Sequence, residues 1–487
     1  MMRGVAENLT NRIAKIPMAM VLIPFALGIF FVERCQLPVW LPLLLCVVSV
    51  VGVISLAEWW QRVALALSLF AVGALIHTLS YRGTIAYGEP VEMVIRIETS
   101  SVSREGYTSA EATIEECESR TLSARKVVVW GDSLMNFRAG DRLLLTTPIR
   151  PFRAEREQYA QLMHHRGFVG AISLNHRATY QYIPAERRSL HDWAVERLRS
   201  ALKPSNARAV VLAMTTGERE EIGNELRKYY SASGASHLLA VSGLHIGIAF
   251  MLINILLLPL ILLRYGNVVR SVVAVALIWL YVWLCGVSPS AVRAAIMFSL
   301  LQFSLSSLRE YASVNILAGT AFVMLAFDSH LLFDISFQLS FIAVAGIVLW
   351  AMPLYRLCAT RFKVANIVIG VLIVGLTSTF ATMPLVANTF STISLVGVLI
   401  NPVVILLANI IVLAGLLSLG IPPIAAIAEI SAKWQNSIIE WSASLPFGHF
   451  NATIPDWVMW VLYLLFGVAT LAIWLLPKQE KMHKIKG

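Results

Sequence analysis

The chain has 487 residues, of which 57% are hydrophobic and only 14% are charged. Soluble domains carry about a quarter charged residues, so this composition excludes an ordinary soluble enzyme and predicts a polytopic α-helical membrane protein. The net charge of +10 is weak evidence for a nucleic-acid partner, because Lys and Arg also gather on the cytoplasmic loops of membrane proteins.

The cysteine pattern does not point to a metal or a cofactor. The five cysteines are scattered, without a CxxC motif or a paired spacing, and such a pattern predicts neither a zinc site nor a disulfide framework. We therefore expect no metal site. We also expect no cofactor and no catalytic residue.

Residues 1–81 are predicted to form a unit of three transmembrane helices, at about 17–32, 37–57 and 63–79. A spanning helix needs about 20 apolar residues. Arg3, Arg12 and Lys15 precede the first segment, which places the N-terminus in the cytoplasm by the positive-inside rule. Three crossings then place the next residues on the outer side.

Residues 82–185 are charged and polar, and we expect them to form an inserted extracytoplasmic OB-like β-barrel domain. The stretches VEMVIRIETSS, SAEATIEECES and RKVVVWGD alternate apolar and polar residues, which is typical of half-buried strands. Several short strands separated by turns fit a small barrel. Residues 186–235 are expected to be connector helices, and their stretch SLHDWAVERLRSALK is amphipathic. Both a membrane-surface helix and a plain connector fit that stretch.

Residues 236–477 are the second hydrophobic half, which brings the total to about 10–12 transmembrane helices. Candidate spans lie at 237–263, 272–287, 290–305, 312–327, 335–352, 367–388 and 457–476. Residues 393–450 must cross an even number of times, either twice or as a re-entrant hairpin broken at Asn401, Pro402, Pro422 and Pro423. The basic tail 478–487 is expected in the cytoplasm.

Polar side chains inside the bilayer are costly and usually face a bundle interior or a water-filled path. On one helix with about 100° per residue, His237, Ser242 and His245 would share a broad face. These three residues could line a passage through the bundle, or they could form hydrogen bonds between helices that hold the bundle together. Both roles fit equally well.

Two further groups of polar residues lie near predicted helix starts. Ser290 and Arg293 share a face, where Arg293 either meets an anion at the helix N-terminus or reaches the outer interface. Asp334 and Gln338 lie one turn apart. Asp334 either caps its helix or pairs with Arg293, and Gln338 is expected to face the bundle.

Two functional classes can be tested against these residues alone. An intramembrane hydrolase would use Ser242 as nucleophile and His245 as base, but a Ser and a His three residues apart on one helix rarely point at each other, and no GxSxG or HExxH motif is present. A small-solute permease would suit the broken helices. However, the two halves show no inverted repeat, and a large outer domain is unusual for that class.

The stretch GASHLLAVSGLHIGI resembles the signature of the ComEC family of bacterial competence proteins. GVSPSAVRAAIM, DISFQLSFIAVAGI and NTFSTISLVGVLINP resemble later blocks of that family, and FRAGDRLLL and YAQLMHHRGFVG resemble the end of its outer domain. The resemblance covers about residues 17–476. Many family members carry a further metallo-β-lactamase-like domain, and no HxHxDH motif is present here, so we expect neither nuclease activity nor a zinc site.

The resemblance implies an inner-membrane channel that imports single-stranded DNA during natural transformation. The pore-lining candidates are His237, Ser242, His245, Ser290, Arg293, Asp334 and Gln338. OB folds bind single strands through basic grooves with aromatic platforms, so the DNA-binding candidates are Arg125, Lys126, Trp130, Arg138, Arg142, Arg150, Phe152 and Arg153. Each of these also fits an ordinary surface or core position. The expected partners are single-stranded DNA, membrane lipids, an outer DNA receptor, a separate nuclease and a cytoplasmic ATP-driven translocase.

Overall fold

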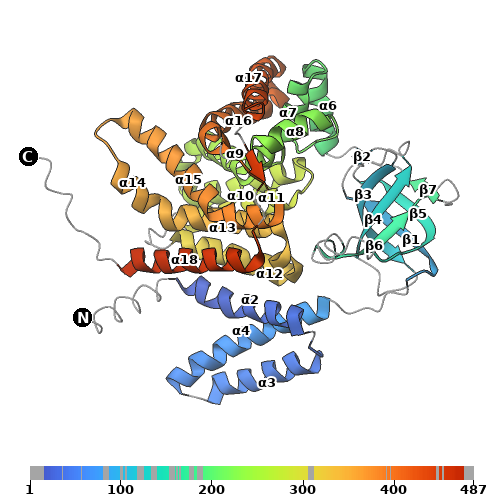
Figure 1. Ribbon diagram of the computed structural model, residues 1–487, viewed down its shortest axis with the longest axis vertical. Helices are drawn as coiled ribbons and strands as arrows, with labels where there is room; N and C mark the ends of the chain where they lie inside the picture. The colour runs from blue at the N-terminus through green and yellow to red at the C-terminus, as the bar shows by residue number, and fades with distance from the viewer. Residues whose placement is uncertain are drawn as a thin grey trace, which may run out of the picture.

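A computed structural model shows three parts, namely a three-helix unit, a curved β-sheet and a larger helical bundle (Figure 1). It describes residues 16–475 apart from 36, 56, 81–86, 99–101, 105–106, 118–124, 133–139, 153–159, 161–162, 164–165, 175–179, 184–189, 305–311, 391, 395, 446–448 and 452–453.

The three N-terminal helices match the three apolar segments predicted for residues 1–81. They are α2 (Pro17–Cys35), α3 (Trp40–Ser55) and α4 (Glu58–Ser80). Two glycines let α2 and α4 approach closely, because a methyl group on Gly28 would meet the Phe70 carbonyl oxygen and one on Gly73 would meet the Phe25 carbonyl oxygen. Small residues of this kind are the usual contact points between membrane helices.

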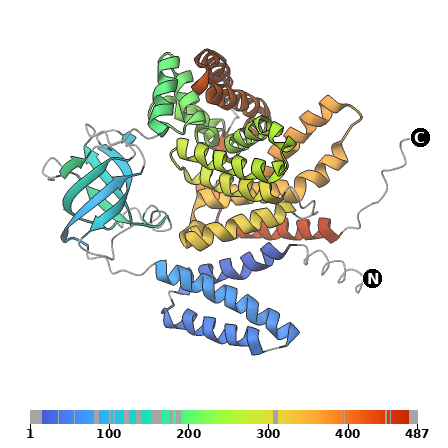
Figure 2. The ribbon, with the colours of Figure 1, turned by 180° about the vertical axis from the view of Figure 1, so that it is seen from behind.

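The sheet follows α4 and has strands β1 (Pro90–Ile97), β2 (Val102–Arg104), β3 (Tyr107–Cys117), β4 (Lys126–Asp132), β5 (Arg142–Pro148), β6 (Phe168–Ser173) and β7 (Tyr180–Ile183). Its order is β6-β4-β3-β1-β5-β7, with β2 on β3. The β4–β6 pair is parallel and the other pairs are antiparallel. Alternate apolar residues such as Ile95, Ile114, Val127 and Leu143 fill one core. The predicted strands are therefore present, and the sheet is strongly curved (Figure 2).

Three helices connect the sheet to the bundle, within the region 186–235 expected to be helical. They are α6 (Leu190–Ala201), α7 (Asn206–Thr215) and α8 (Asn224–Ala232). Almost every residue of α7 is buried, in one core with residues of α16 and α17. These connectors are thus built into the bundle. Trp193 of α6 nevertheless stays 48% exposed.

The bundle contains helices and short strands from residue 236 onwards. They are η2 (Ser236–Leu239), α9 (Gly243–Leu256), η3 (Leu258–Leu262), α10 (Gly266–Leu284), α11 (Pro289–Ser304), α12 (Ala312–Phe327), η4 (Ser329–Phe333), α13 (Ile335–Gly346), η5 (Ile347–Ala351), α14 (Met352–Cys358), α15 (Lys363–Phe390), β8 (Thr392–Ser394), α16 (Val396–Gly420), η6 (Pro422–Ile424), α17 (Ala425–Ala443), β9 (His449–Asn451) and α18 (Asp456–Leu475). Six helices of the described chain are long and apolar enough to span a membrane, and five shorter ones are apolar. The chain is a membrane protein with many hydrophobic helices.

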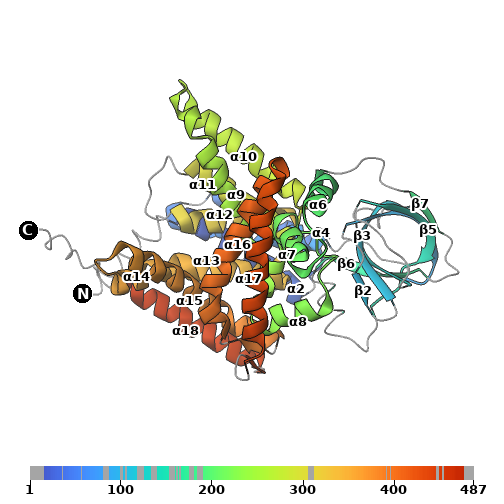
Figure 3. The ribbon, with the colours of Figure 1, turned by 90° about the horizontal axis from the view of Figure 1, so that it is seen from above.

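The region 393–450 begins and ends at the same end of the bundle. Strand β8 pairs with β9, and Asn388 at the end of α15 donates hydrogen bonds to the Ile454 carbonyl and the Asp456 carboxylate at the start of α18. Between these points α16 runs unbroken through Pro402, and α17 packs back against it after the turn at Pro422. Figure 3 shows α16 and α17 side by side, crossing the direction of α18. Because both ends meet, an even number of crossings is required, as the sequence predicts.

Candidate functional site

The single helix predicted from His237 onwards is wrong. Residues Ser236–Leu239 form a 3-10 turn, Ala240 is extended, and α9 starts at Gly243 with Ser242 as its N-cap residue. A serine followed by a glycine is a good helix start, and this local preference outweighs the hydropathy of the segment. His237 therefore does not share a helix face with Ser242 and His245.

A strained turn precedes the helix that carries Arg293. Gly286 and Val287 both have left-handed backbone angles, with φ of 70° and 54°. This conformation is costly for a β-branched residue and tends to occur at functional sites. Pro289 then opens α11, as its fixed φ favours, and the hydroxyl of the preceding Ser288 has no hydrogen-bond partner in the described residues.

Arg293 is a buried cation one turn into α11. It is only 3% exposed, and its Nη2 donates to the Ser336 hydroxyl at 3.0 Å. Its Nε and Nη1 have no hydrogen-bond partner among the described residues. The Asp334 carboxylate instead accepts from the Phe337 amide at 2.8 Å and lies 3.8 Å from Nε of Arg166. Asp334 thus caps α13, and no direct bond between it and Arg293 is seen.

His245 and Ser242 lie at the start of α9, next to α11. The Ser242 amide donates to Nδ1 of the fully buried His245 at 3.2 Å. Across the interface, a methyl group on Gly243 would stand 3.8 Å from Ala294, the neighbour of Arg293. The start of α9 therefore packs beside the Arg293 turn of α11.

Several buried polar atoms of the bundle share one property, which is that they have no hydrogen-bond partner within the described part of the chain. On α9 and α11 and at their starts they belong to Ser242, His245, Asn254, Ser288, Arg293 and Gln302, and on α7, α16 and α17 they belong to Thr215, Asn401, Asn409 and Gln435. Native proteins satisfy the great majority of such atoms, and each exception needs an explanation such as an ordered water or a ligand. The interior of this bundle is therefore suited to polar occupants.

The remaining pore candidates are placed differently. His237 is exposed on η2, and Ser290 is half-buried in the first turn of α11. Gln338 donates to the Leu332 carbonyl at 2.9 Å, so its amide turns back towards the start of its own helix. The structure brings Arg293 to the start of α13, where Ser336 and Asp334 lie. His237 is separated from this group by the break before α9.

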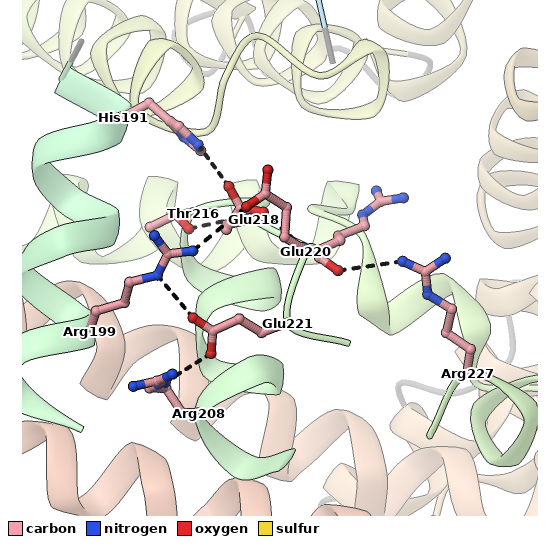
Figure 4. A network of polar contacts seen from close by, with 9 residues as sticks. His191, Arg199, Arg208, Thr216, Glu218, Glu220, Glu221 and Arg227 are labelled. Atoms are coloured by element: carbon pink, nitrogen blue, oxygen red, sulfur yellow. Dashed lines mark hydrogen bonds and ion pairs between the residues drawn. The ribbon is translucent and has the colours of Figure 1, made fainter. Parts of the chain in front are cut away.

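A polar network missed by the sequence reasoning lies between α6, α7 and the loop that follows α7 (Figure 4). Glu221 bonds Arg199 at 2.9 Å and Arg208 at 2.8 Å, and Glu218 lies 3.8 Å from His191. Nδ1 of His191 lies within hydrogen-bonding distance, 2.8 Å, of the Leu284 carbonyl, which precedes the strained turn. The network therefore supports the turn from which α11 starts. In the sequence, the acidic stretch GEREEIG at residues 217–223 was the signal from which this network could have been predicted.

The His191–Glu218 pair has perturbed protonation equilibria. Burial alone would lower the pKa of His191, but the Glu218 carboxylate and the Leu284 carbonyl outweigh it and raise that pKa. For Glu218, burial acts to raise the pKa, and His191, the Glu220 amide and Arg199 together lower it. Both shifts favour the ion pair.

The structure places the DNA-binding candidates of the sheet in different environments. Trp130 and Phe152 pack together over Val128, Met163 and Phe168 in a small apolar cluster. Lys126 and Arg150 are exposed, and Arg142 bonds Glu115 at 2.8 Å. Arg125 donates from Nη1 to the Ser80 carbonyl at 2.6 Å. Arg138 and Arg153 lie outside the described residues.

Two arginines of the sheet region reach the helices. Arg125 reaches the end of α4, as described above. Arg166 bonds Glu111 of β3 at 2.8 Å and lies 3.8 Å from Asp334 at the start of α13. The path Glu111–Arg166–Asp334 therefore joins the sheet to the helix that holds the hydroxyl partner of Arg293.

The fold and the site define a class of protein, a polytopic membrane protein whose helical bundle encloses incompletely paired polar groups. A model of the competence protein family matches residues 214–478, more than half of the chain. The chain belongs to the competence protein family, and this membership supports a role in DNA uptake during transformation.

The chain is also similar to individual bacterial proteins. An uncharacterised protein of Aquifex aeolicus (strain VF5) is 28% identical over 352 residues, covering 71% of this chain and 77% of that protein. ComE operon protein 3 of Bacillus subtilis (strain 168) is 28% identical over 248 residues, covering 50% of this chain and 30% of that protein. The uncharacterised protein YcaI of Escherichia coli (strain K12) is 23% identical over 330 residues, covering 64% and 41%. The chain thus spans less than half the length of these last two relatives. No solved structure matches it.

Proposed function

We propose that this protein is an inner-membrane channel that imports single-stranded DNA, with both termini in the cytoplasm and the sheet outside. The observation that carries the proposal is Arg293, a cation 3% exposed whose Nε and Nη1 have no partner in the described chain. A buried charge is very costly unless it is paired, so a transient anionic partner explains why it is kept. The phosphates of a passing strand are such a partner.

The composition of the proposed path suits a polymer that must slide. The start of α9, which packs beside α11, offers the Ser242 hydroxyl and the His245 imidazole, and Arg293 itself bonds the Ser336 hydroxyl. Conduction needs binding strong enough for entrance and weak enough for release. One fixed cation among neutral hydrogen-bonding groups meets both needs, whereas a row of arginines would hold the strand.

The outer sheet is proposed as an OB-like platform that receives the strand. Lys126, Val128 and Trp130 alternate along one face of β4, and Phe152 packs in the same cluster as Trp130. Single-strand binding combines basic groups with aromatic surfaces on which bases stack. Lys126 beside the Trp130–Phe152 cluster supplies both. The remaining proposed partners are membrane lipids, an outer receptor, a separate nuclease and an ATP-driven translocase on the cytoplasmic side.

We propose no enzymatic activity for this chain. A serine nucleophile needs a base within hydrogen-bonding distance of its hydroxyl. His245 accepts from the Ser242 amide, whereas the Ser242 hydroxyl has no hydrogen-bond partner in the part of the chain that is described. The geometry therefore gives no support to the intramembrane hydrolase, and no contact favours a small-solute permease.

The test is DNA uptake in a naturally transformable host whose own gene of this family is deleted. We expect the wild-type chain to restore entrance of labelled DNA into the DNase-protected cytoplasmic fraction. Arg293→Gln should lower uptake about tenfold or more, because losing a charge-assisted hydrogen bond costs about 1.5–3 kcal/mol. Arg293→Lys should keep part of the activity.

The matched control is Arg264→Gln, which makes the same change at an exposed position. Membrane levels of all variants are compared by immunoblot. Uptake by Arg293→Gln equal to wild type at equal protein level would show that Arg293 does not meet the strand. Normal uptake by the deletion host carrying no copy of this chain would contradict the transport function itself.

A further inference from the structure

A cavity lies beside η2, outside the group around Arg293. Its volume is about 420 Å³, and its lining residues are Arg219, Ile222, Arg227, Ser231, Ser236 and Leu239. Ligand pockets usually measure about 300–1,000 Å³, so this one is large enough for a small charged group and its attachments. The lining combines two guanidinium groups and two hydroxyls with two apolar side chains.

The glutamates of the adjacent loop do not neutralise these two arginines. Glu221 bonds Arg199 and Arg208, Glu218 faces His191, and Glu220 lies 3.9 Å from Arg199. Figure 4 shows Arg199, Arg208 and His191 on one side of the loop and Arg227 on the other. None of these three glutamates forms an ion pair with Arg219 or Arg227 among the described residues.

The two arginines of the pocket act on each other as like charges. Nη2 of Arg227 donates to the Arg219 carbonyl at 3.4 Å, and no ion pair of either guanidinium occurs within the described ranges. Partial desolvation lowers the pKa of Arg219, and the charge of Arg227 lowers it further. The charge of Glu218 acts in the opposite direction. An anion between the two groups would relieve this repulsion.

The chemistry of the lining selects a phosphate group. Guanidinium groups present planar forks that match phosphate oxygens, and the hydroxyls of Ser231 and Ser236 add neutral donors. Ile222 and Leu239 provide an apolar wall against which a sugar or a base edge can lie. Phosphodiesters of a nucleic-acid strand and phosphates of lipid headgroups share this chemistry.

We propose that the pocket formed by Arg219, Arg227, Ser231 and Ser236 binds a backbone phosphate of the imported strand. This inference rests on the proposed function. Ser236 and Leu239 belong to η2, only a few residues before Ser242 and His245 of α9. A phosphate held there would place the strand next to the polar start of α9, which makes the pocket a holding site beside the path.

The first test is protection of arginines from phenylglyoxal, read by mass spectrometry on the purified full-length protein. The probes are a deoxythymidine oligonucleotide, inorganic phosphate, and nanodiscs with and without phosphatidylglycerol. We expect the oligonucleotide to protect Arg219 and Arg227 and to leave the exposed Arg264 reactive. Protection by phosphatidylglycerol but not by the oligonucleotide would overturn the nucleic-acid assignment and identify a lipid site. Protection by none of the probes would overturn the site altogether.

The second test is the salt dependence of oligonucleotide binding. Each phosphate contact to a single strand contributes about 0.7 to the slope of log affinity against log salt. Because the two arginines hold one phosphate, Arg219→Gln combined with Arg227→Gln should reduce the slope by about 0.7. The control Lys228→Gln, an exposed neighbour on α8, should leave it unchanged. An unchanged slope in the double variant contradicts the proposal.

These readouts separate the pocket from the channel. Both tests measure binding to purified protein, whereas the proposed function is tested by uptake in cells. Protection of Arg219 and Arg227 without any uptake would support the pocket and contradict the channel. Uptake that depends on Arg293, with no protection of the pocket arginines, would support the channel and overturn the pocket.

Discussion

Charged side chains that are removed from solvent find different partners in this protein. Asp334 caps α13 and faces Arg166, so both the helix N-terminus and a cation stabilise its charge. Glu221 sits between two arginines. Arg293 has one neutral hydroxyl partner. Because of this difference, we assign a functional role to Arg293 and a structural role to Asp334 and Glu221.

The His191–Glu218 pair predicts a pH-dependent stability. A histidine whose pKa is raised in the folded state stabilises that state most below its unfolded pKa, and the contribution is lost as the pH rises through the raised value. Because the pKa of His191 is raised from 6.5, thermal stability in detergent should decrease from about pH 6 upwards. Glu218, with a lowered pKa, keeps its contribution until acid pH.

The variant His191→Gln should remove this part of the decrease. Its melting temperature should be lower than that of wild type near pH 6, and the two should converge at alkaline pH. Lys228→Gln is the control, since it changes an exposed side chain of α8 that has no ion pair among the described residues. Parallel melting curves for wild type and His191→Gln across this range would refute the assignment.

Residue-level prediction from the sequence succeeded where the signal was local. A helix cap was one of the two roles predicted for Asp334, and the structure shows that cap. The helix face proposed for His237, Ser242 and His245 failed because hydropathy does not reveal the break at Ala240. The His191–Glu218 contact joins a residue of α6 to a residue of the loop after α7, 27 positions later, and no periodicity predicts which side chains meet there.

At the scale of elements, the packing of α2 on α4 depends on glycine. Gly28→Ala would push a methyl group into the Phe70 carbonyl oxygen, and the rigid helix backbone cannot yield locally. Overpacking of this kind costs about 1–3 kcal/mol. We expect a reduced unfolding midpoint in a denaturing-detergent titration.

The matched control is Gly467→Ala on α18, where an added methyl group meets no atom within 4 Å. There the better helix propensity of alanine should leave stability equal or raise it by up to about 1 kcal/mol. Equal midpoints for Gly28→Ala and wild type would show that α2 and α4 are not in close contact.

The elements themselves were largely predictable, but the way they meet was not. Apolar run length located α2, α3, α4 and α18 to within a few residues. The sequence predicts that residues 393–450 cross the membrane an even number of times. It did not reveal that β8 pairs with β9, because that pairing joins two short segments about 55 residues apart. Pro402, expected to break a helix, lies inside α16.

At the scale of the whole molecule, polar contacts connect the sheet to the helices. Arg125 donates to the Ser80 carbonyl, and Arg166 faces Asp334. Partly exposed ion pairs contribute only about 0–1 kcal/mol each. The proposed transfer of a strand from the sheet to the bundle needs the two parts to stay in register, so these contacts should matter more for position than for stability.

We therefore predict that Arg125→Ala combined with Arg166→Ala releases the sheet while leaving it folded. Spin labels at the exposed Thr146 of β5 and at Ser444 after α17 report the distance between the two parts by pulsed electron resonance, in a background without other cysteines. The wild-type chain should give a narrow distance distribution and the double variant a broad one. Arg142→Ala, whose partner Glu115 lies within the sheet itself, should remain narrow. Narrow distributions in all three proteins would mean that other contacts hold the sheet in place, and the path from Glu111 to Arg293 would lose its role in positioning.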